Sequence, residues 1–98
     1  MIAAKEYRQG EEILFAACDV DCLDKHLKEG KVSLKVDPDF YDGGRIDDAE
    51  FALAFRRATI ANLVGDKVVG LAIDLGFIES GQVITIDGVP HAQYALLM

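Results

Sequence analysis

A chain of 98 residues has the size of one domain, so residues 1–98 are expected to fold as a single unit. Its hydrophobic share of 51% argues against a disordered chain and provides enough apolar material for one core. Seventeen acidic residues against ten basic ones give a formal net charge of −7, which argues against non-specific nucleic-acid binding and against anionic membranes.

Membrane insertion and export also find no support in the sequence. No apolar run approaches the ~20 residues that span a bilayer. The first ten residues carry charges where a signal peptide would be apolar. We therefore expect a cytoplasmic protein. In that reducing compartment Cys18 and Cys22, only four residues apart, are expected to remain thiols.

The first half of the chain suggests strands around one short helix. Residues 2–8 and 11–18 flank a glycine turn, which predicts a β-hairpin. Apolar residues at helical spacing predict a helix over residues 19–29, ended by Gly30. Residues 32–36 alternate between apolar and polar side chains, as a strand with one buried face does.

A helix with a clear start signal follows an acidic loop. Asp47 can serve as its N-cap, with Glu50 three residues later as the partner in a capping box. The buried stripe of this helix is predicted to consist of Phe51, Ala54, Phe55 and Ala58. We expect this helix to break or bend around residues 62–65.

Another helix is predicted from Asp66, taken as its cap, to Gly76, with Phe77 folding back as in a Schellman motif. Its residues between 68 and 75 are apolar on nearly every side, which predicts burial on more than one side and suggests a subunit interface. Gly70 lowers helix propensity, so we expect it to permit a close backbone approach.

The chain ends in a second predicted hairpin around Asp87-Gly88. Counting back from this turn places Thr85 opposite Pro90 in a non-hydrogen-bonded pair, so Pro90 is expected only where its strand is an edge. The same register places five side chains on one face of the sheet: Ile84, Ile86, Val89, His91 and Gln93.

These elements predict an α+β fold, a two-layer sandwich with a mainly antiparallel or mixed sheet of about five strands. Two hairpins and one further strand supply the sheet, and about three helices pack mainly on one of its faces.

Two segments carry a family resemblance, TIANLVGDKVVGLAIDLGFI and the later ITIDGVPHAQ. Together with the opening hairpin that ends at Cys18-Asp19 and the loop at Phe40-Tyr41, they make the chain similar to an archaeal family catalogued as domain of unknown function 424. The resemblance implies a compact two-layer α+β domain. It implies no activity and no catalytic residue.

Three residues form a weak candidate metal site. Cys18, Cys22 and His26 would share one face of the predicted helix, with Asp19 as a fourth ligand. Structural zinc sites usually take ligands from two separated elements, and Cys18 at the end of an apolar strand fits a core position. We expect no metal and no cofactor.

The segment from Asn62 to Lys67 weakly resembles a turn that presents backbone amides to a phosphate. Gly65 would allow the turn and Lys67 would add positive charge, but Asp66 would repel an anion. A purely structural turn, with Asp66 as a helix cap, is the favoured interpretation.

His91 and Gln93 are the candidates from the last strand. His91 could act as a general base or contact RNA, and the Gln93 amide can donate and accept hydrogen bonds. The alternative, which we favour, is a structural histidine that bonds to a neighbouring backbone or carboxylate group.

Two functional hypotheses result. The first is a non-enzymatic accessory module that binds a protein or ribonucleoprotein partner, in translation or RNA handling. The second is a small hydrolase or transferase that uses His91. We also expect a homodimer, formed through helix 66–75, the apolar C-terminal strand with its tail 94–98, or both.

Overall fold

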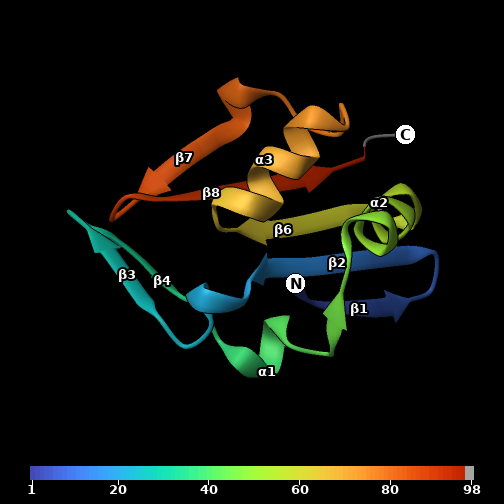
Figure 1. The fold of residues 1–98 in the computed structure, drawn as a ribbon, viewed down its shortest axis with the longest axis horizontal. Helices are drawn as coiled ribbons and strands as arrows, with labels where there is room; N and C mark the ends of the chain where they lie inside the picture. Colours follow the sequence, from blue (N-terminus) through green and yellow to red (C-terminus); the bar gives the residue numbers. More distant parts are fainter. Residues whose placement is uncertain (97–98) are drawn as a thin grey trace.

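The computed structural model describes residues 1–96 and contains eight strands and three α-helices (Figure 1). The strands are β1 (Ile2–Gln9), β2 (Glu12–Asp19), β3 (His26–Glu29), β4 (Val32–Lys35), β5 (Arg45–Ile46), β6 (Ile60–Val64), β7 (Val83–Ile86) and β8 (Val89–Ala95). The helices are α1 (Pro38–Tyr41), α2 (Asp48–Arg57) and α3 (Asp66–Asp74), and single 3-10 turns lie at Val20–Cys22 and Ser80–Gln82.

Six strands form one sheet in the order β5-β1-β2-β6-β8-β7. β2 and β6 run parallel, and every other neighbouring pair in this sheet is antiparallel. The hairpin β3–β4 forms a separate two-stranded sheet. The predicted α+β class with a mainly antiparallel sheet is therefore confirmed, with six strands in the main sheet instead of five.

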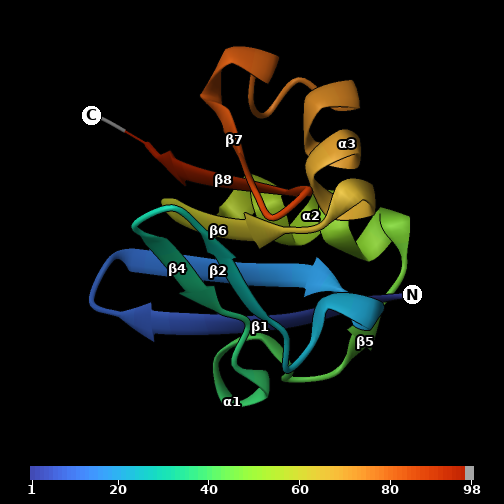
Figure 2. The ribbon, with the colours of Figure 1, turned by 90° about the vertical axis from the view of Figure 1, so that its left-hand side faces the viewer.

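The two longer helices cover one face of the main sheet, as predicted, while the hairpin β3–β4 and α1 lie against the other face (Figure 2). On the helix side the core is built around the rings of Phe15, Phe51 and Phe55. On the hairpin side a second cluster contains Cys18 and Tyr41. The sheet thus buries apolar side chains on both faces, which lets so small a chain hold six strands together.

The predicted signals at α2 and at the end of α3 are confirmed. The Asp47 carboxylate accepts a hydrogen bond from the Glu50 amide at 2.8 Å, and the Glu50 side chain accepts one from the Asp47 amide at 3.1 Å. At the end of α3, Phe77 N–H donates to the Ala72 carbonyl and Gly76 N–H donates to the Ile73 carbonyl, both at 3.0 Å. These two bonds make a Schellman motif.

The predicted helix over residues 19–29 is wrong. A single 3-10 turn is followed by Asp24, whose positive φ of 70° ends the helical geometry, and then by β3. Leu27 is buried opposite Leu34 of β4, and Gly30 with φ 61° lies in the hairpin turn instead of capping a helix. Three apolar residues at helical spacing are too few to exclude a turn followed by a strand.

The bend expected at residues 62–65 is also wrong, because α2 ends at Arg57 and residues 60–64 form β6 in the middle of the sheet. The segment is a short apolar run buried between two strands, and a run of this length does not distinguish strand from helix.

β8 pairs with β7 on one side and with β6 on the other, but the β6–β8 ladder begins at His91, so β8 is an edge at Pro90 itself, as expected. The predicted pair between Thr85 and Pro90 is present. Pro90 lies one residue beyond the β6–β8 ladder, where its carbonyl accepts a hydrogen bond from Gly65 N–H at 2.9 Å. At the end of a ladder the missing proline N–H removes at most one bond.

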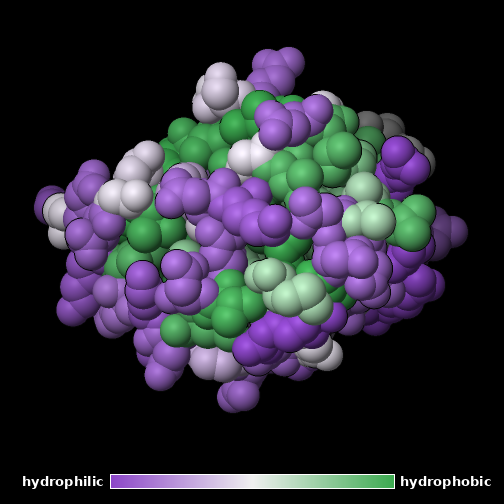
Figure 3. All heavy atoms as spheres, viewed as in Figure 1, coloured by the Kyte–Doolittle hydropathy of each residue, from purple (hydrophilic) through white to green (hydrophobic). Residues whose placement is uncertain are grey.

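α3 buries Val68, Val69 and Ala72 and leaves Leu75 exposed. Apolar side chains gather on the visible face over this helix (Figure 3). The close backbone approach expected at Gly70 is not found, because a side chain there would meet no atom within 4 Å. None of the helices in residues 1–96 is long and apolar enough to cross a membrane.

Candidate functional site

Half of the sheet face on the hairpin side remains open. The hairpin and α1 cover the end of the face that contains Cys18 and Val64, while the other end carries the accessible side chains. The ladder registers place on this open half Leu14 from β2, Ile60 and Asn62 from β6, Gln93 and Ala95 from β8, and Ile84 from β7.

Three hollows follow one another across this open half. The first, about 560 Å³, lies between the hairpin and β7–β8. The second, about 320 Å³, shares Gln93 with the first, and the third, about 530 Å³, shares Leu14 and Ile60 with the second. We call this row of three adjoining hollows, with the six residues of the open half as its floor, the trough.

His91 and Gln93 both line the first hollow together with Ile84 and Ile86, so the predicted common face is confirmed. His91 is 8% exposed, and its Nδ1 lies 2.9 Å from the Leu63 carbonyl oxygen. A carbonyl oxygen accepts only, so Nδ1 must carry the proton in this bond, and neutral His91 then has its lone pair on Nε2. The bond to a neighbouring backbone group that the structural interpretation requires is thus present.

The surroundings of His91 limit its chemistry. Among residues 1–96, no aspartate or glutamate lines the first hollow. Its one hydroxyl belongs to Ser33, whose oxygen lies 2.5 Å from His26 Nε2. His91 can therefore accept a proton or a hydrogen bond, but no activated nucleophile lies beside it.

Asn62 is the residue that the sequence placed in a turn and the structure places on the floor of the trough. It pairs with Gln93 across the β6–β8 ladder, so two side-chain amides lie next to each other at the centre. The Tyr41 hydroxyl donates to Asn62 Oδ1 at 2.5 Å, which fixes the carbonyl end of that amide toward α1. The alternation of side chains along residues 60–64 is the signal that could have revealed this role.

Gly65 and Lys67, the other two residues of the predicted phosphate turn, lie at the start of α3. Gly65 is the N-cap residue, and Asp66 is the first helical residue instead of the cap. The Asp19 carboxylate accepts hydrogen bonds from the amides of Lys67 at 2.9 Å and Val68 at 3.0 Å. A carboxylate from β2 thus already occupies the position that an anion would take. The Lys67 ammonium forms an ion pair with Asp48 at 3.0 Å.

The three candidate metal ligands do not form one group. His26 is exposed on β3, whereas Cys18 and Cys22 are buried together in the hairpin-side core. Burial raises the pKa of the Cys18 thiol to about 12 and that of the Cys22 thiol to about 11, and neighbouring acidic groups add to both shifts. Both thiols are therefore protonated at neutral pH, whereas a metal binds the thiolate.

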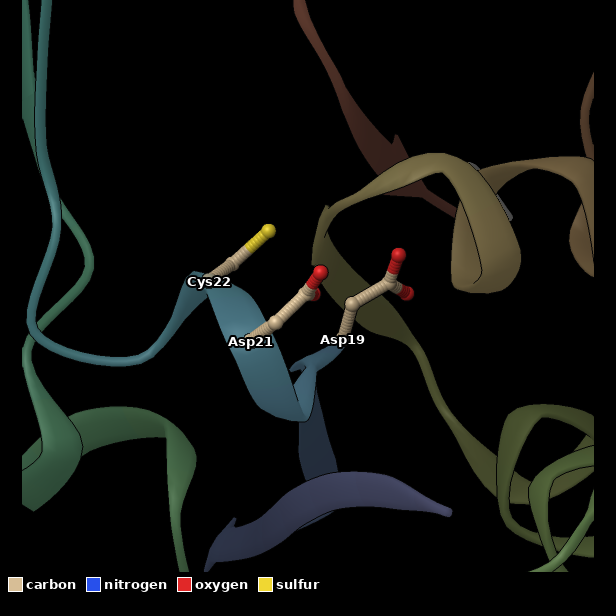
Figure 4. A group of neighbouring side chains, drawn as sticks. All are labelled: Asp19, Asp21 and Cys22. Carbon is tan, nitrogen blue, oxygen red and sulfur yellow. The ribbon is translucent and has the colours of Figure 1, made fainter.

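The side chains of Asp19, Asp21 and Cys22 lie close together beside the start of α3, with ligand atoms within 4.8 Å of one another (Figure 4). Both carboxylate oxygens of Asp19 are already hydrogen-bonded to the α3 amides, and the Cys22 thiol is protonated. These contacts assign Asp19 a structural role as the cap of α3.

The trough carries no concentration of positive charge. Lys5 beside it donates to the Asp39 carbonyl at 2.9 Å, and Arg8 forms an ion pair with Glu6 at 3.1 Å. Glu12 also lines the third hollow. A surface that binds nucleic-acid phosphates needs clustered Lys and Arg, so apolar and amide groups define what the trough can bind.

Comparisons with known proteins agree with this fold. A family model described as "Protein of unknown function (DUF424)" matches residues 7–97. The crystal structure of an uncharacterized conserved protein from the archaeon Methanopyrus kandleri has a TM-score of 0.83 and 24% identity, over 98% of this chain and 91% of that one. At this identity the likeness shows the fold alone. No curated protein matches the chain. Since the family model covers nearly its whole length, the chain belongs to the DUF424 family, and the resemblance inferred from its own residues is confirmed.

Proposed function

We propose that the chain is a non-enzymatic binding module whose trough binds an extended apolar segment of a partner protein. The observation that carries this proposal is the row of three adjoining hollows, with shared lining residues, across the open half of the sheet. Exposed apolar side chains there include Ile60 at 41% and Ile84 at 53%. Between them, the amides of Asn62 and Gln93 can pair with a partner's backbone. Contiguous apolar surface with a polar centre is typical of protein interaction sites.

The net charge favours a basic protein as the partner. A formal charge of −7 attracts positive segments and repels polyanions at long range. Ribonucleoprotein particles contain basic proteins that neutralise RNA, so a role in translation or RNA handling is compatible with a direct protein contact. In this proposal the chain binds the protein component of such a particle and not its RNA.

A photo-cross-linking experiment tests this function. The full chain would carry a benzophenone amino acid at residue 60, in the trough, or at residue 75, the C-cap of α3. These positions are matched, because Ile60 is 41% and Leu75 is 42% exposed. After irradiation in native cell extract, we expect a protein adduct from position 60 that is absent from position 75.

Two treatments of the same sample identify the partner class. An adduct that survives nuclease digestion and weakens with added salt supports a direct contact with a basic protein. An adduct that is lost on nuclease digestion would show that RNA is the ligand and would overturn the proposal. Equal labelling from both positions, or none from position 60, would overturn it as well.

A hydrolase or transferase that uses His91 is the alternative function. The hydrogen bond between Nδ1 and the Leu63 carbonyl favours it, because that bond presents the Nε2 lone pair as a base. The absence of a carboxylate and of a free nucleophile from the first hollow, among the residues described, weighs against it. Hydrolysis of an activated ester above background that His91→Gln abolishes would favour the enzyme.

A further inference from the structure

β7 is the last strand of the sheet, and within residues 1–96 no strand pairs with its outer edge. The two-residue turn at Asp87-Gly88 makes Ile86 and Val89 a hydrogen-bonded pair, so Thr85 and Val83 belong to the non-hydrogen-bonded pairs. Their peptide groups therefore point away from β8. The Val83 N–H bonds to the Ser80 carbonyl, whereas the Thr85 N–H and the carbonyls of Val83 and Thr85 bond to nothing else within residues 1–96.

This edge lacks the features that protect exposed strands. Its sequence, Val-Ile-Thr-Ile, consists of β-branched residues and contains no proline and no charged residue. The opposite side of the sheet differs, because β5 has two residues and the uncovered part of β1 carries Lys5, Glu6 and Arg8. One edge of the sheet is thus protected and the other is suited to pairing.

We propose that two copies of the chain pair antiparallel through β7, with Ile84 opposite the partner's Ile84 on a two-fold axis. In this register the Thr85 N–H of each copy donates to the partner's Val83 carbonyl. The Thr85 carbonyl faces the partner's Val83 N–H, which stays bonded to the Ser80 carbonyl, so the pairing adds one hydrogen bond from each copy. Ile84 becomes a close non-hydrogen-bonded pair, and its 53% exposed side chain is covered by its own symmetry mate. An interface in which both copies use the same surface across a two-fold axis forms a closed dimer.

The charges around the edge are compatible with this register. The paired stretch is short, because residues 80–82 form a 3-10 turn and only Val83, Ile84 and Thr85 can pair in this register. None of these three residues is charged. The tip of the hairpin β3–β4 is held beside β7 by the Asp87 N–H, which donates to the Glu29 side chain at 2.9 Å.

The proposed interface differs from the two surfaces that the sequence suggested, helix 66–75 and the C-terminal strand. The C-terminal strand β8 is flanked by β7 and β6 through residue 92, so it is not the free edge, and Leu97 and Met98 of the tail lie outside the described residues. This inference is independent of the proposed function. It adds that the troughs of the two copies, which both reach Ile84, would join into one longer depression across the axis.

The expected affinity is modest. Three paired residues per copy bury less than the ~800 Å² per partner of a standard stable interface, so a dissociation constant in the micromolar range is expected. Sedimentation equilibrium of the full chain from about 1 to about 200 µM should show a mass that rises from one toward two chains. Thr85→Pro removes an N–H that bonds to nothing within the described chain, so the fold should survive while the dimer weakens at least tenfold.

Disulfide trapping tests the register. Ile84→Cys should cross-link into a covalent dimer on mild oxidation, because facing residues of a non-hydrogen-bonded pair are close enough for a disulfide. Leu53→Cys on α2 is the matched control, since Leu53 is 57% exposed and lies far from β7 in the fold. The native cysteines are buried and protonated and should not compete.

The proposal is supported if Ile84→Cys cross-links much faster than Leu53→Cys and Thr85→Pro sediments as a monomer. A wild-type chain that remains monomeric at the highest concentration would overturn it. A dimer that survives Thr85→Pro but dissociates on Leu71→Lys or Leu96→Lys would overturn it too, because the interface would then be α3 or the C-terminal segment.

Discussion

The carboxylate of Asp19 occupies the space that a side chain at residue 65 would need. A Cβ atom built on Gly65 would lie 2.3 Å from Asp19 Cγ, and Gly65 also has a positive φ of 122°. From this position the carboxylate caps the amides of Lys67 and Val68 at the start of α3. The end of β2, the end of β6 and the start of α3 are therefore joined at one point.

Gly65→Ala should destabilise the chain strongly, by about 2 kcal/mol or more, because it combines steric overlap with an unfavourable backbone conformation. Gly70→Ala is the matched control within the same helix. A side chain there meets no atom within 4 Å, so the gain in helix propensity should stabilise the chain by about 0.5–1 kcal/mol. Urea denaturation measures both. Equal effects of the two substitutions would contradict this account of Gly65.

Asp19→Ala should cost about 1–2 kcal/mol of stability, the usual value of a lost helix cap. It should also relieve the overlap, so Gly65→Ala should cost less in the Asp19→Ala background than in the wild type. A double-mutant cycle measures this coupling between the two residues. Additive effects would show that the carboxylate and residue 65 do not compete for the same space.

Stability should fall at alkaline pH. Burial raises the pKa of Cys18 to about 12 and of Cys22 to about 11, from 9.0, and it also raises the pKa of the Tyr41 hydroxyl. Below pH 9 these three groups are protonated in both the folded and the unfolded chain, so their contribution to the free energy of unfolding is fully present. Above it the unfolded chain loses protons first, so the free energy of unfolding decreases as pH rises toward the folded-state values.

Two measurements check this prediction. Urea midpoints should be lower at pH 10 than at pH 8, and Cys18→Ala/Cys22→Ala should reduce this difference. The thiols of the folded wild type should react with a disulfide reagent only as fast as the chain opens. Rapid labelling of both thiols at pH 8 in native buffer would be inconsistent with their burial.

Local signals in the sequence were sufficient for α2, for the end of α3 and for the last hairpin. The capping box of Asp47 and the turn at Asp87-Gly88 act over a few residues, so they could be recognised without tertiary information. The turn also fixed the register that places His91 and Gln93 on one face. This part of the candidate site could therefore be predicted.

Contacts between residues far apart in the sequence could not be predicted from local signals. The cap of α3 comes from Asp19, which lies 48 residues before Lys67 in the chain, and the nearby Asp66 gave a misleading local signal. The strand β6 owes its conformation to pairing with β2 and β8, because a short apolar run alone does not define it. The place of Asn62 in the candidate site therefore follows only from the pairing of the strands in the sheet.

His91→Phe provides a final test, of whether this residue is structural. Phenylalanine retains the ring in a site that is 8% exposed but cannot donate to the Leu63 carbonyl, so the chain should lose about 1 kcal/mol of stability. Gln93→Leu, on the exposed floor of the trough, should change stability by less than about 0.5 kcal/mol. If His91→Phe were as stable as the wild type, the hydrogen bond to Leu63 would contribute nothing, and a chemical role for the imidazole would become the better explanation of this buried histidine.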